Sequence, residues 1–214
     1  MTNETLNQIL NNINNEIYKE IDYAIRSISS DVDLININAI NCIELNFNNF
    51  YDFYLLKGNN TKDKYIGIIL DMENDLHILI NKEYRGHKYL QKTLIPTILP
   101  FIAYYKERSI QYLTFESSKV EEYFIKEFGF KKTDTLRKLY ISLEDMIEVY
   151  KSEFESTINM SEDIEEKLIS ELDNAILTLR MIERKLELQK NNTFFSENNY
   201  LSDVYCDLKD RIRF

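Results

Sequence analysis

Two short apolar segments joined by three polar residues constrain the fold more than any other part of the chain. Residues 64–72 and 76–80 are rich in isoleucine and leucine, as buried strands are, and Glu73-Asn74-Asp75 lies between them. A connection of this length and composition is typical of a β-hairpin, so we expect the two strands to pair antiparallel. A helical pattern follows over residues 88–107, which means that the hairpin leads through a short loop into a helix.

The rest of the first part of the chain alternates between strand and helix patterns. Strands are predicted at 33–38, 43–47, 51–57, 110–115 and 136–143, and helices at 3–28 and from Ser117 or Ser118 to 128. Pro96 and Pro100 fall inside the helical pattern over 88–107 and predict a kink or an early end, because proline removes a backbone donor and clashes with the preceding turn. This order predicts an α+β (α/β-like) fold in which helices flank a mixed, mostly antiparallel sheet.

Beyond residue 143 the pattern is purely helical. Two series of apolar residues lie on either side of a break at 159–161: first Leu143, Ile147, Tyr150 and Phe154, then Leu168, Leu172, Ala175, Leu179, Ile182 and Leu186. The second series repeats at alternating steps of four and three, which predicts a coiled-coil seam. We therefore divide the chain into a domain at 1–143 and a helical hairpin or coiled-coil arm at 144–214, which folds back or pairs with another chain.

Charge and cysteine content exclude several classes of function. With 36 acidic and 26 basic residues the formal net charge is -10, so the chain lacks the basic footprint that a nucleic-acid partner requires. The two cysteines, Cys42 and Cys206, lie far apart and form no Cys/His motif, so no metal site is expected. No apolar stretch is long enough to span a bilayer and no secretory signal is visible near Met1, so we expect a cytoplasmic protein without membrane contact.

The segment after the hairpin carries the strongest chemical signal. A strand ends near Ile80, a short loop carries Arg85 and Gly86, and a helix starts near Lys88. The first N–H groups of a helix lack intrahelical partners and carry partial positive charge, which favours a phosphate there. Gly86 permits close backbone approach, and its basic neighbours add positive charge. One interpretation is an anion-binding loop; the other is an ordinary strand–loop–helix connection.

Two stretches of this region resemble one family. Residues 80–90, with the run Glu-Tyr-Arg-Gly, are similar to the acyl-CoA motif of GNAT N-acetyltransferases, which has the form Arg/Gln-x-x-Gly-x-Gly/Ala. Residues 113–130, which end in Glu-Phe-Gly-Phe, resemble the fifth strand, the next helix and its ending in the same family. The resemblance is clear over 64–143 and weaker over 1–63, where the strand that usually precedes the first helix is not evident.

The resemblance implies a GNAT fold and an N-acyltransferase that moves an acetyl or other acyl group from acyl-CoA to a primary amine of a small molecule, peptide or protein. The main-chain groups of Ile78, Leu79 and Ile80 would then align the pantetheine arm as an added strand does. The following loop would hold the pyrophosphate through Arg85, Gly86, His87, Lys88 and Tyr89.

The family mechanism is a direct attack of the amine on the thioester. It needs a neutral amine, which a carboxylate or a water chain can arrange, and a backbone N–H that polarises the carbonyl. Candidate bases are Glu116, at the end of a strand, and Asp71 or Glu73 on the preceding hairpin. His77 alternates with apolar neighbours, so we expect a half-buried strand histidine more than a catalytic one.

The chain departs from the family pattern at three positions. Lys88 and Leu90 stand where the motif has small residues, and Ile125 stands where the family has a tyrosine that protonates the leaving thiolate. Tyr123 is two residues away, which is about 200° around a helix. These departures favour a second hypothesis, a catalytically degenerate binding module that engages a protein partner or a second copy through its C-terminal helices.

Overall fold

The computed structural model of the chain describes residues 2–17, 23–37, 51–59, 61–115, 117–146, 162–190 and 205–210. The chain forms two compact units, Met1–Glu155 and Ser156–Phe214. The predicted strand at 43–47 and the predicted helical positions at 147–154 lie outside the described ranges. Within those ranges, no helix combines the length and apolarity needed to cross a membrane.

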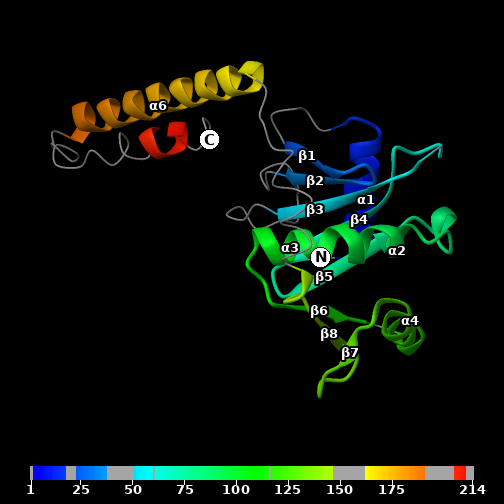
Figure 1. Cartoon of the computed structure of the whole chain (residues 1–214). Helices are drawn as coiled ribbons and strands as arrows, with labels where there is room; N and C mark the ends of the chain where they lie inside the picture. The colour runs from blue at the N-terminus through cyan, green and yellow to red at the C-terminus, as the bar shows by residue number, and fades with distance from the viewer. Residues whose placement is uncertain are drawn as a thin grey trace. The chain divides into compact units, whose positions relative to one another are not determined.

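A sheet of eight strands forms the centre of the first unit, in the order β1-β2-β3-β4-β5-β6-β8-β7 (Figure 1). The strands are β1 (Tyr23–Ser29), β2 (Val32–Ile37), β3 (Tyr51–Lys57), β4 (Tyr65–Met72), β5 (Asp75–Ile80), β6 (Ile110–Thr114), β7 (Lys131–Lys132) and β8 (Lys138–Ser142). Neighbours pair antiparallel except β5 and β6, which are parallel. The predicted mixed, mostly antiparallel sheet is therefore confirmed.

The predicted helix over 88–107 is interrupted as its prolines require. It consists of α2 (Tyr89–Thr93), a π-helical turn η4 (Leu94–Ile98) and α3 (Leu99–Tyr105), after a short 3₁₀ turn η3 (Lys82–Tyr84). Pro96 lies inside the π-helical turn, and Pro100 lies in the first turn of α3, where a missing N–H is tolerated. The predicted interruption of the helix at its prolines is confirmed.

Helices cover both faces of the sheet and create two apolar clusters. On one face, α1 (Asn3–Asn14) buries Leu6 against Leu79 of β5. On the other face, α3 and α4 (Ser118–Phe128) pack against Leu76 of β5, with Phe124 of α4 buried there. Side chains at positions 76 and 79 point to opposite faces because a strand alternates with period two. The sheet thus forms the middle of three layers.

The β4–β5 hairpin is as tight as its sequence predicts. The turn Glu73-Asn74 joins the strands directly, and the φ angle of its first residue is 64°, the left-handed conformation of short hairpin turns. Gly67 of β4 pairs with Ile80 at the far end of β5. A Cβ at position 67 would lie 2.9 Å from the carbonyl oxygen of Leu79, so only glycine permits this close approach.

The helix predicted over 3–28 is confirmed over Asn3–Asn14 and is wrong over residues 23–28. Helix α1 ends at Asn14, and Tyr23–Ser29 pair with β2 as a strand. The apolar spacing suits a helix throughout, but asparagine is a poor helix former, and the Asn15 side chain donates to the Asn11 carbonyl at 2.8 Å. Pairing with a neighbouring strand then decides the structure of the second half.

The last elements of the first unit follow their predictions with small shifts of boundary. Helix α4 ends at Gly129, whose φ of 75° is the left-handed conformation that terminates many helices. The final strand starts at Lys138, because Leu136 lies in the turn between β7 and β8 with 84% of its surface exposed.

The second unit contains α6 (Glu162–Lys190) and a short helix at 205–210. The Tyr205 hydroxyl donates to the Asp173 carboxylate of α6 at 2.6 Å and joins the two helices. Ile176 is buried, whereas Leu179 and Ile182 of the predicted seam are 45% and 49% exposed. The long helix is present as predicted, and part of its seam faces solvent.

Candidate functional site

Strands β5 and β6 are joined at one point and separate beyond it. They share a single register pair, Asp75 with Tyr112. Just beyond β5, Asn81 donates its N–H to β4 at 2.9 Å, and alternate residues of an antiparallel strand face the same neighbour. The residues whose main-chain groups face away from β4, into the gap, are therefore Leu76, Ile78 and Ile80. This gap between β5 and β6 is called the fork.

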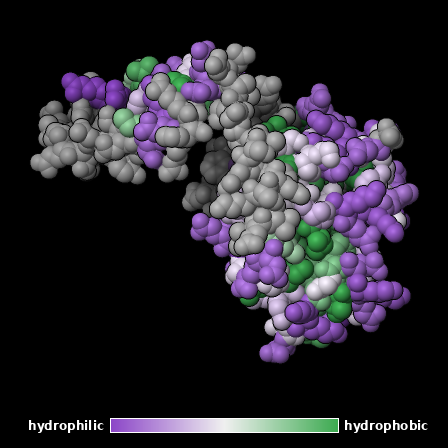
Figure 2. Space-filling view, in the orientation of Figure 1, coloured by the Kyte–Doolittle hydropathy of each residue, from purple (hydrophilic) through white to green (hydrophobic). Residues whose placement is uncertain are grey.

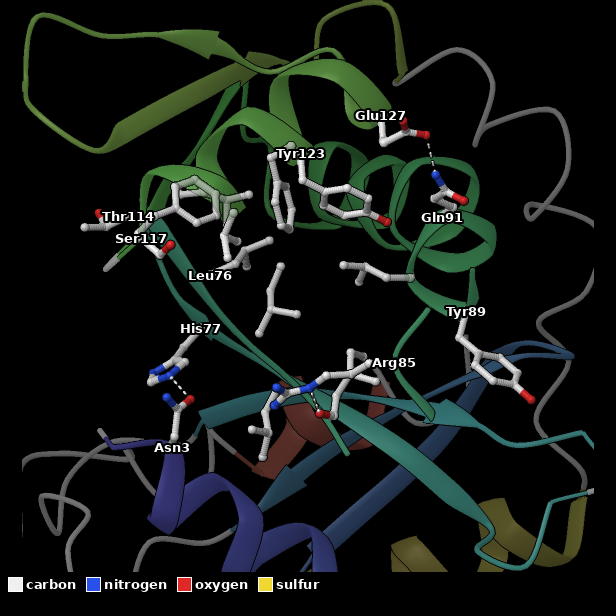
Figure 3. A pocket seen from close by; sticks show the side chains of 18 of the residues that line it. Asn3, Leu76, His77, Arg85, Tyr89, Gln91, Thr114, Ser117, Tyr123 and Glu127 are labelled. Atoms are coloured by element: carbon white, nitrogen blue, oxygen red, sulfur yellow. Dashed lines mark hydrogen bonds between the residues drawn. The ribbon is translucent and has the colours of Figure 1, made fainter. Parts of the chain in front are cut away.

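A groove of about 1110 Å³ follows the fork. Its walls come from β5, the loop after β5, the start of α2, the end of β6 and one face of α4 (Figure 3). Many of the side chains that line it are apolar, and apolar side chains are exposed between α2 and α4 in the space-filling view (Figure 2). The groove is thus an apolar channel along an open strand edge.

A buried polar network holds the closed end of the fork. The Arg108 guanidinium donates to both oxygens of Asp71, at 3.0 and 3.2 Å, and to the amide oxygen of Gln111 at 2.5 Å. Gln111 of β6 is fully buried and donates to the Asn74 carbonyl at 3.1 Å. This chain of hydrogen bonds ties β6 to the β4–β5 turn.

The Asp75 carboxylate ends the ladder between β5 and β6. It accepts the N–H of Thr114 at 3.1 Å, where a longer ladder would use a main-chain carbonyl of β5. The edge of β5 from Leu76 onward is thereby left open to the groove. Sequence reasoning treats Asp75 only as a turn residue, because pairing between distant strands is not visible in the local pattern.

The candidate bases that the structure describes lie outside the groove. Asp71 belongs to the buried network, where burial raises the pKa of its carboxyl and the neighbouring Arg108 opposes that rise. Glu73 is exposed in the hairpin turn. Glu116 lies outside the described residues. A catalytic role for any of the three stays a prediction.

The loop after β5 places most of its predicted binding groups at the groove. The predicted cofactor residues that line it are Ile78, Leu79, Ile80, Arg85, Gly86, Lys88 and Tyr89. His87 lies beside the Tyr89 ring instead, with ring centroids 6.2 Å apart. The Arg85 Nε donates to the Ile80 carbonyl at 2.9 Å, which holds the guanidinium at the edge of β5 (Figure 3). Gly86 is needed for its backbone conformation, with φ of 82°.

Lys88 adopts a backbone conformation that favours glycine. Its φ of 64° and ψ of 15° are left-handed, at the residue before α2. This conformation costs a residue with a side chain roughly 1–2 kcal/mol. The chain therefore keeps the left-handed turn although it has a lysine where the motif has a small residue. The lysine also adds a positive charge at the groove. Leu90, the other departure, is half-buried against the core and lines the groove.

Helix α4 turns Tyr123, not residue 125, into the groove. Tyr123 and Glu127 line it from the same helix face, while Ile125 packs against the core. Glu127 accepts a hydrogen bond from Gln91 of α2 at 2.7 Å (Figure 3). Burial and the negative charge of Glu127 raise the pKa of the Tyr123 hydroxyl, so it stays protonated at neutral pH. Reasoning from the family position misses this residue, because the rotation of α4 is set by the residues that it buries in the core.

His77 lines the groove from the opposite face of the sheet. Its Nε2 lies 3.0 Å from Oδ1 of Asn3, in the first turn of α1 (Figure 3). The ring is half-buried, as its place in an alternating strand predicts. Asn3 is too distant in sequence to be associated with β5 from the pattern alone.

No family model, curated protein or solved structure matches the chain. Across the described ranges, no three His, Cys, Asp or Glu side chains gather where they would hold a metal ion. The groove offers an open main-chain edge, a basic loop at one end, a protonated tyrosine on one face and a histidine on the other.

Proposed function

We propose that the chain is an N-acyltransferase, which binds acyl-CoA in the groove and transfers the acyl group to a primary amine. The observation that carries the proposal is the open edge of β5 running into a loop with Arg85 and Lys88. Acyl-CoA is a long, thin molecule with amides in its arm and a pyrophosphate beyond them. An edge of alternating N–H and C=O groups suits the amides, and cationic side chains suit the pyrophosphate. The resemblance of residues 80–90 to the GNAT acyl-CoA motif supports the same assignment.

The main-chain groups available to the pantetheine arm are the Leu76 carbonyl and the groups of Ile78 and Ile80, because the Leu76 N–H belongs to the ladder that pairs Asp75 with Tyr112. The main-chain groups of Leu79 face β4, and its side chain packs in the cluster beneath α1. Leu79 therefore helps to hold β5 in place but provides no hydrogen bonds to a ligand at the open edge. Because Arg85 already binds the Ile80 carbonyl, Leu76 and Ile78 provide the groups nearest the closed end of the fork.

The transfer joins the amine nitrogen to the carbonyl carbon of the thioester and breaks the carbon–sulfur bond. Tyr123 is the proton donor to the departing sulfur, since it lines the groove and a tyrosine hydroxyl is protonated at neutral pH. A main-chain N–H at the open edge of β5 polarises the carbonyl. The products are an amide and a free thiol.

Charge reversal at Arg85 should weaken the binding of acetyl-CoA. Arg85→Glu places a carboxylate where the pyrophosphate is proposed to lie, and a hydrogen bond to a charged group contributes about 1.5–3 kcal/mol. We expect the Kd to rise roughly tenfold or more, measured by isothermal titration calorimetry. Lys131→Glu, the same reversal on exposed β7, is the control and should keep the wild-type Kd. Equal affinity of wild type and Arg85→Glu would show that the pyrophosphate binds elsewhere.

The exposed stretch of α6 favours a second role for the C-terminal unit, pairing with another copy. Leu177, Leu179, Met181 and Ile182 are between 45% and 61% exposed. A native mass spectrum should show twice the chain mass of 25.6 kDa for the wild type, and the single mass for Leu179→Glu combined with Ile182→Glu. Lys185→Glu on the same helix should leave the assembly intact. A wild type that stays monomeric at high concentration contradicts this role.

A further inference from the structure

One face of α4 follows the groove. Val120, Tyr123, Phe124 and Glu127 line it, and their spacing places them on one side of the helix. Glu127 accepts a hydrogen bond from Gln91 of α2, so the C-terminal end of this face lies beside the helix that follows the basic loop. The N-terminal end of the face therefore lies at the other end of the groove, where β6 leads into α4.

This other end of the groove carries four apolar side chains on the α4 face. Leu76 and Leu113 directly follow the residues that join β5 to β6, and both belong to the cluster that contains Phe124. The Phe115 ring packs on Phe124, with ring centroids 4.9 Å apart. Val120 completes the set and is 44% exposed although it is apolar. We call Leu76, Leu113, Phe115 and Val120 the apolar end; an exposed apolar wall of this kind is typical of a site for an apolar ligand.

Tyr123 sets the order in which a bound acyl-CoA meets these residues. The pyrophosphate is proposed to lie at the basic loop, and the sulfur is proposed to lie beside Tyr123. Val120 comes three residues earlier in α4, about 4.5 Å along the helix axis and away from the loop. The carbon atoms beyond the thioester carbonyl therefore lie against Val120 and Phe115.

We propose that the transferred acyl group is a straight chain of medium length, which binds in the apolar end. The inference rests on the proposed acyl transfer. From Tyr123 to Ser117, which lines the groove just before α4 (Figure 3), the chain advances about 9 Å. An extended carbon chain advances about 1.2 Å per bond, so a chain of about eight carbons fills this length. An acetyl group leaves most of the apolar end uncovered.

The chemistry is the same for a longer chain. The carbonyl carbon leaves the sulfur and bonds to the amine nitrogen, and the nitrogen loses one proton as the sulfur gains one. The products are a medium-chain amide and free CoA thiol.

Calorimetric titration of the intact protein with acetyl-, butanoyl-, hexanoyl- and octanoyl-CoA tests the chain length. A methylene group that is fully buried strengthens binding by about fourfold, and one on the open side of the groove by less. We expect the Kd to fall at each step and to be at least about tenfold lower for octanoyl-CoA than for acetyl-CoA. Equal Kd values for these two esters overturn the inference.

Val120→Gln places an amide against the proposed chain. The Kd of octanoyl-CoA should rise about tenfold, because the chain then covers a polar group, whereas the Kd of acetyl-CoA should stay within about twofold of wild type. Retained binding of acetyl-CoA also shows that the variant is folded. Glu122→Gln, an exposed change on α4 outside the groove, is the control and should leave both Kd values unchanged. Wild-type affinity of Val120→Gln for octanoyl-CoA contradicts the inference.

Turnover separates this inference from the function on which it rests. With a panel of primary amines, free thiol should be released with a higher kcat/KM from octanoyl-CoA than from acetyl-CoA. If both esters react equally well and Val120→Gln raises only the KM of an apolar amine such as octylamine, the apolar end binds the acceptor. That result overturns the inference and leaves acyl transfer standing. A wild type that binds none of the four esters and releases no thiol overturns the acyltransferase function, and the inference with it.

Discussion

Arg108→Met is expected to lower the free energy of unfolding by about 3–5 kcal/mol, because it leaves a buried carboxylate without its partner. The side chains of Asp71 and Arg108 are only 4% and 14% exposed. Arg108 also donates to Gln111, so its loss removes a second buried hydrogen bond at the closed end of the fork. Urea denaturation followed by circular dichroism measures the effect.

The matched control removes a charge from the surface. Lys131 is exposed on β7, so Lys131→Met should change the free energy of unfolding by no more than about 0.5 kcal/mol. Equal losses in the two variants would show that the Arg108 network does not support the fold.

The loss at Arg108 should also depend on pH. Burial already raises the pKa of Asp71 above its ordinary value of 3.8, and removal of Arg108 raises that pKa further. A carboxyl with a raised pKa in the folded state stabilises the fold below 3.8 and loses this contribution as the pH rises through the raised value. The deficit of Arg108→Met should therefore be smaller near about pH 4 than near about pH 7.

Tyr123→Phe is expected to reduce kcat by about 10²–10⁴-fold with little change in the Kd for acetyl-CoA. The change removes only the hydroxyl oxygen and keeps the ring, so the fall in kcat measures how much the donated proton contributes to catalysis. Burial and the negative charge of Glu127 raise the pKa of Tyr123, so the fall of the wild-type rate on the alkaline side should come above the ordinary pKa of a tyrosine. Steady-state release of free thiol measures both effects.

A second tyrosine provides the comparison for Tyr123. Tyr105 is exposed at the end of α3, and its hydroxyl accepts from Arg26 at 3.3 Å, away from the groove. Tyr105→Phe should keep wild-type kcat. Turnover of Tyr123→Phe within about threefold of wild type would exclude the tyrosine as proton donor.

Features set by neighbouring residues are predictable from the sequence. The β4–β5 hairpin follows from two apolar runs and a short polar turn, and the interruption of the helix over 88–107 follows from Pro96 and Pro100. Gly129 ends α4 with the left-handed φ that its position suggests. In each case the interactions that decide the local structure lie within a few residues of one another, so the local sequence pattern predicts that structure.

Features set by distant pairing are not predictable in this way. Residues 23–29 have helical spacing, yet they form a strand because β2 is available as a partner. The fork depends on Asp75 accepting from Thr114, far along the chain. Neither contact leaves a periodic signal in the sequence.

The candidate site divides along the same line. The basic loop around Arg85 is recognisable because its strand, glycine and helix are contiguous. Tyr123 is not recognisable as a groove residue from the sequence, because the burial of Phe124 and Phe128 in the core sets the rotation of α4. His77 is paired with Asn3 only because α1 packs on β5.

Titration of acetyl-CoA into the intact wild-type protein tests the account most directly. We expect saturable binding of one molecule per chain, with a stabilisation of about 2.7 kcal/mol at a concentration one hundred times the Kd, visible as a rise in melting temperature. Neither heat of binding nor a change in melting temperature at millimolar acetyl-CoA would contradict the assignment of the β5–β6 groove to acyl-CoA.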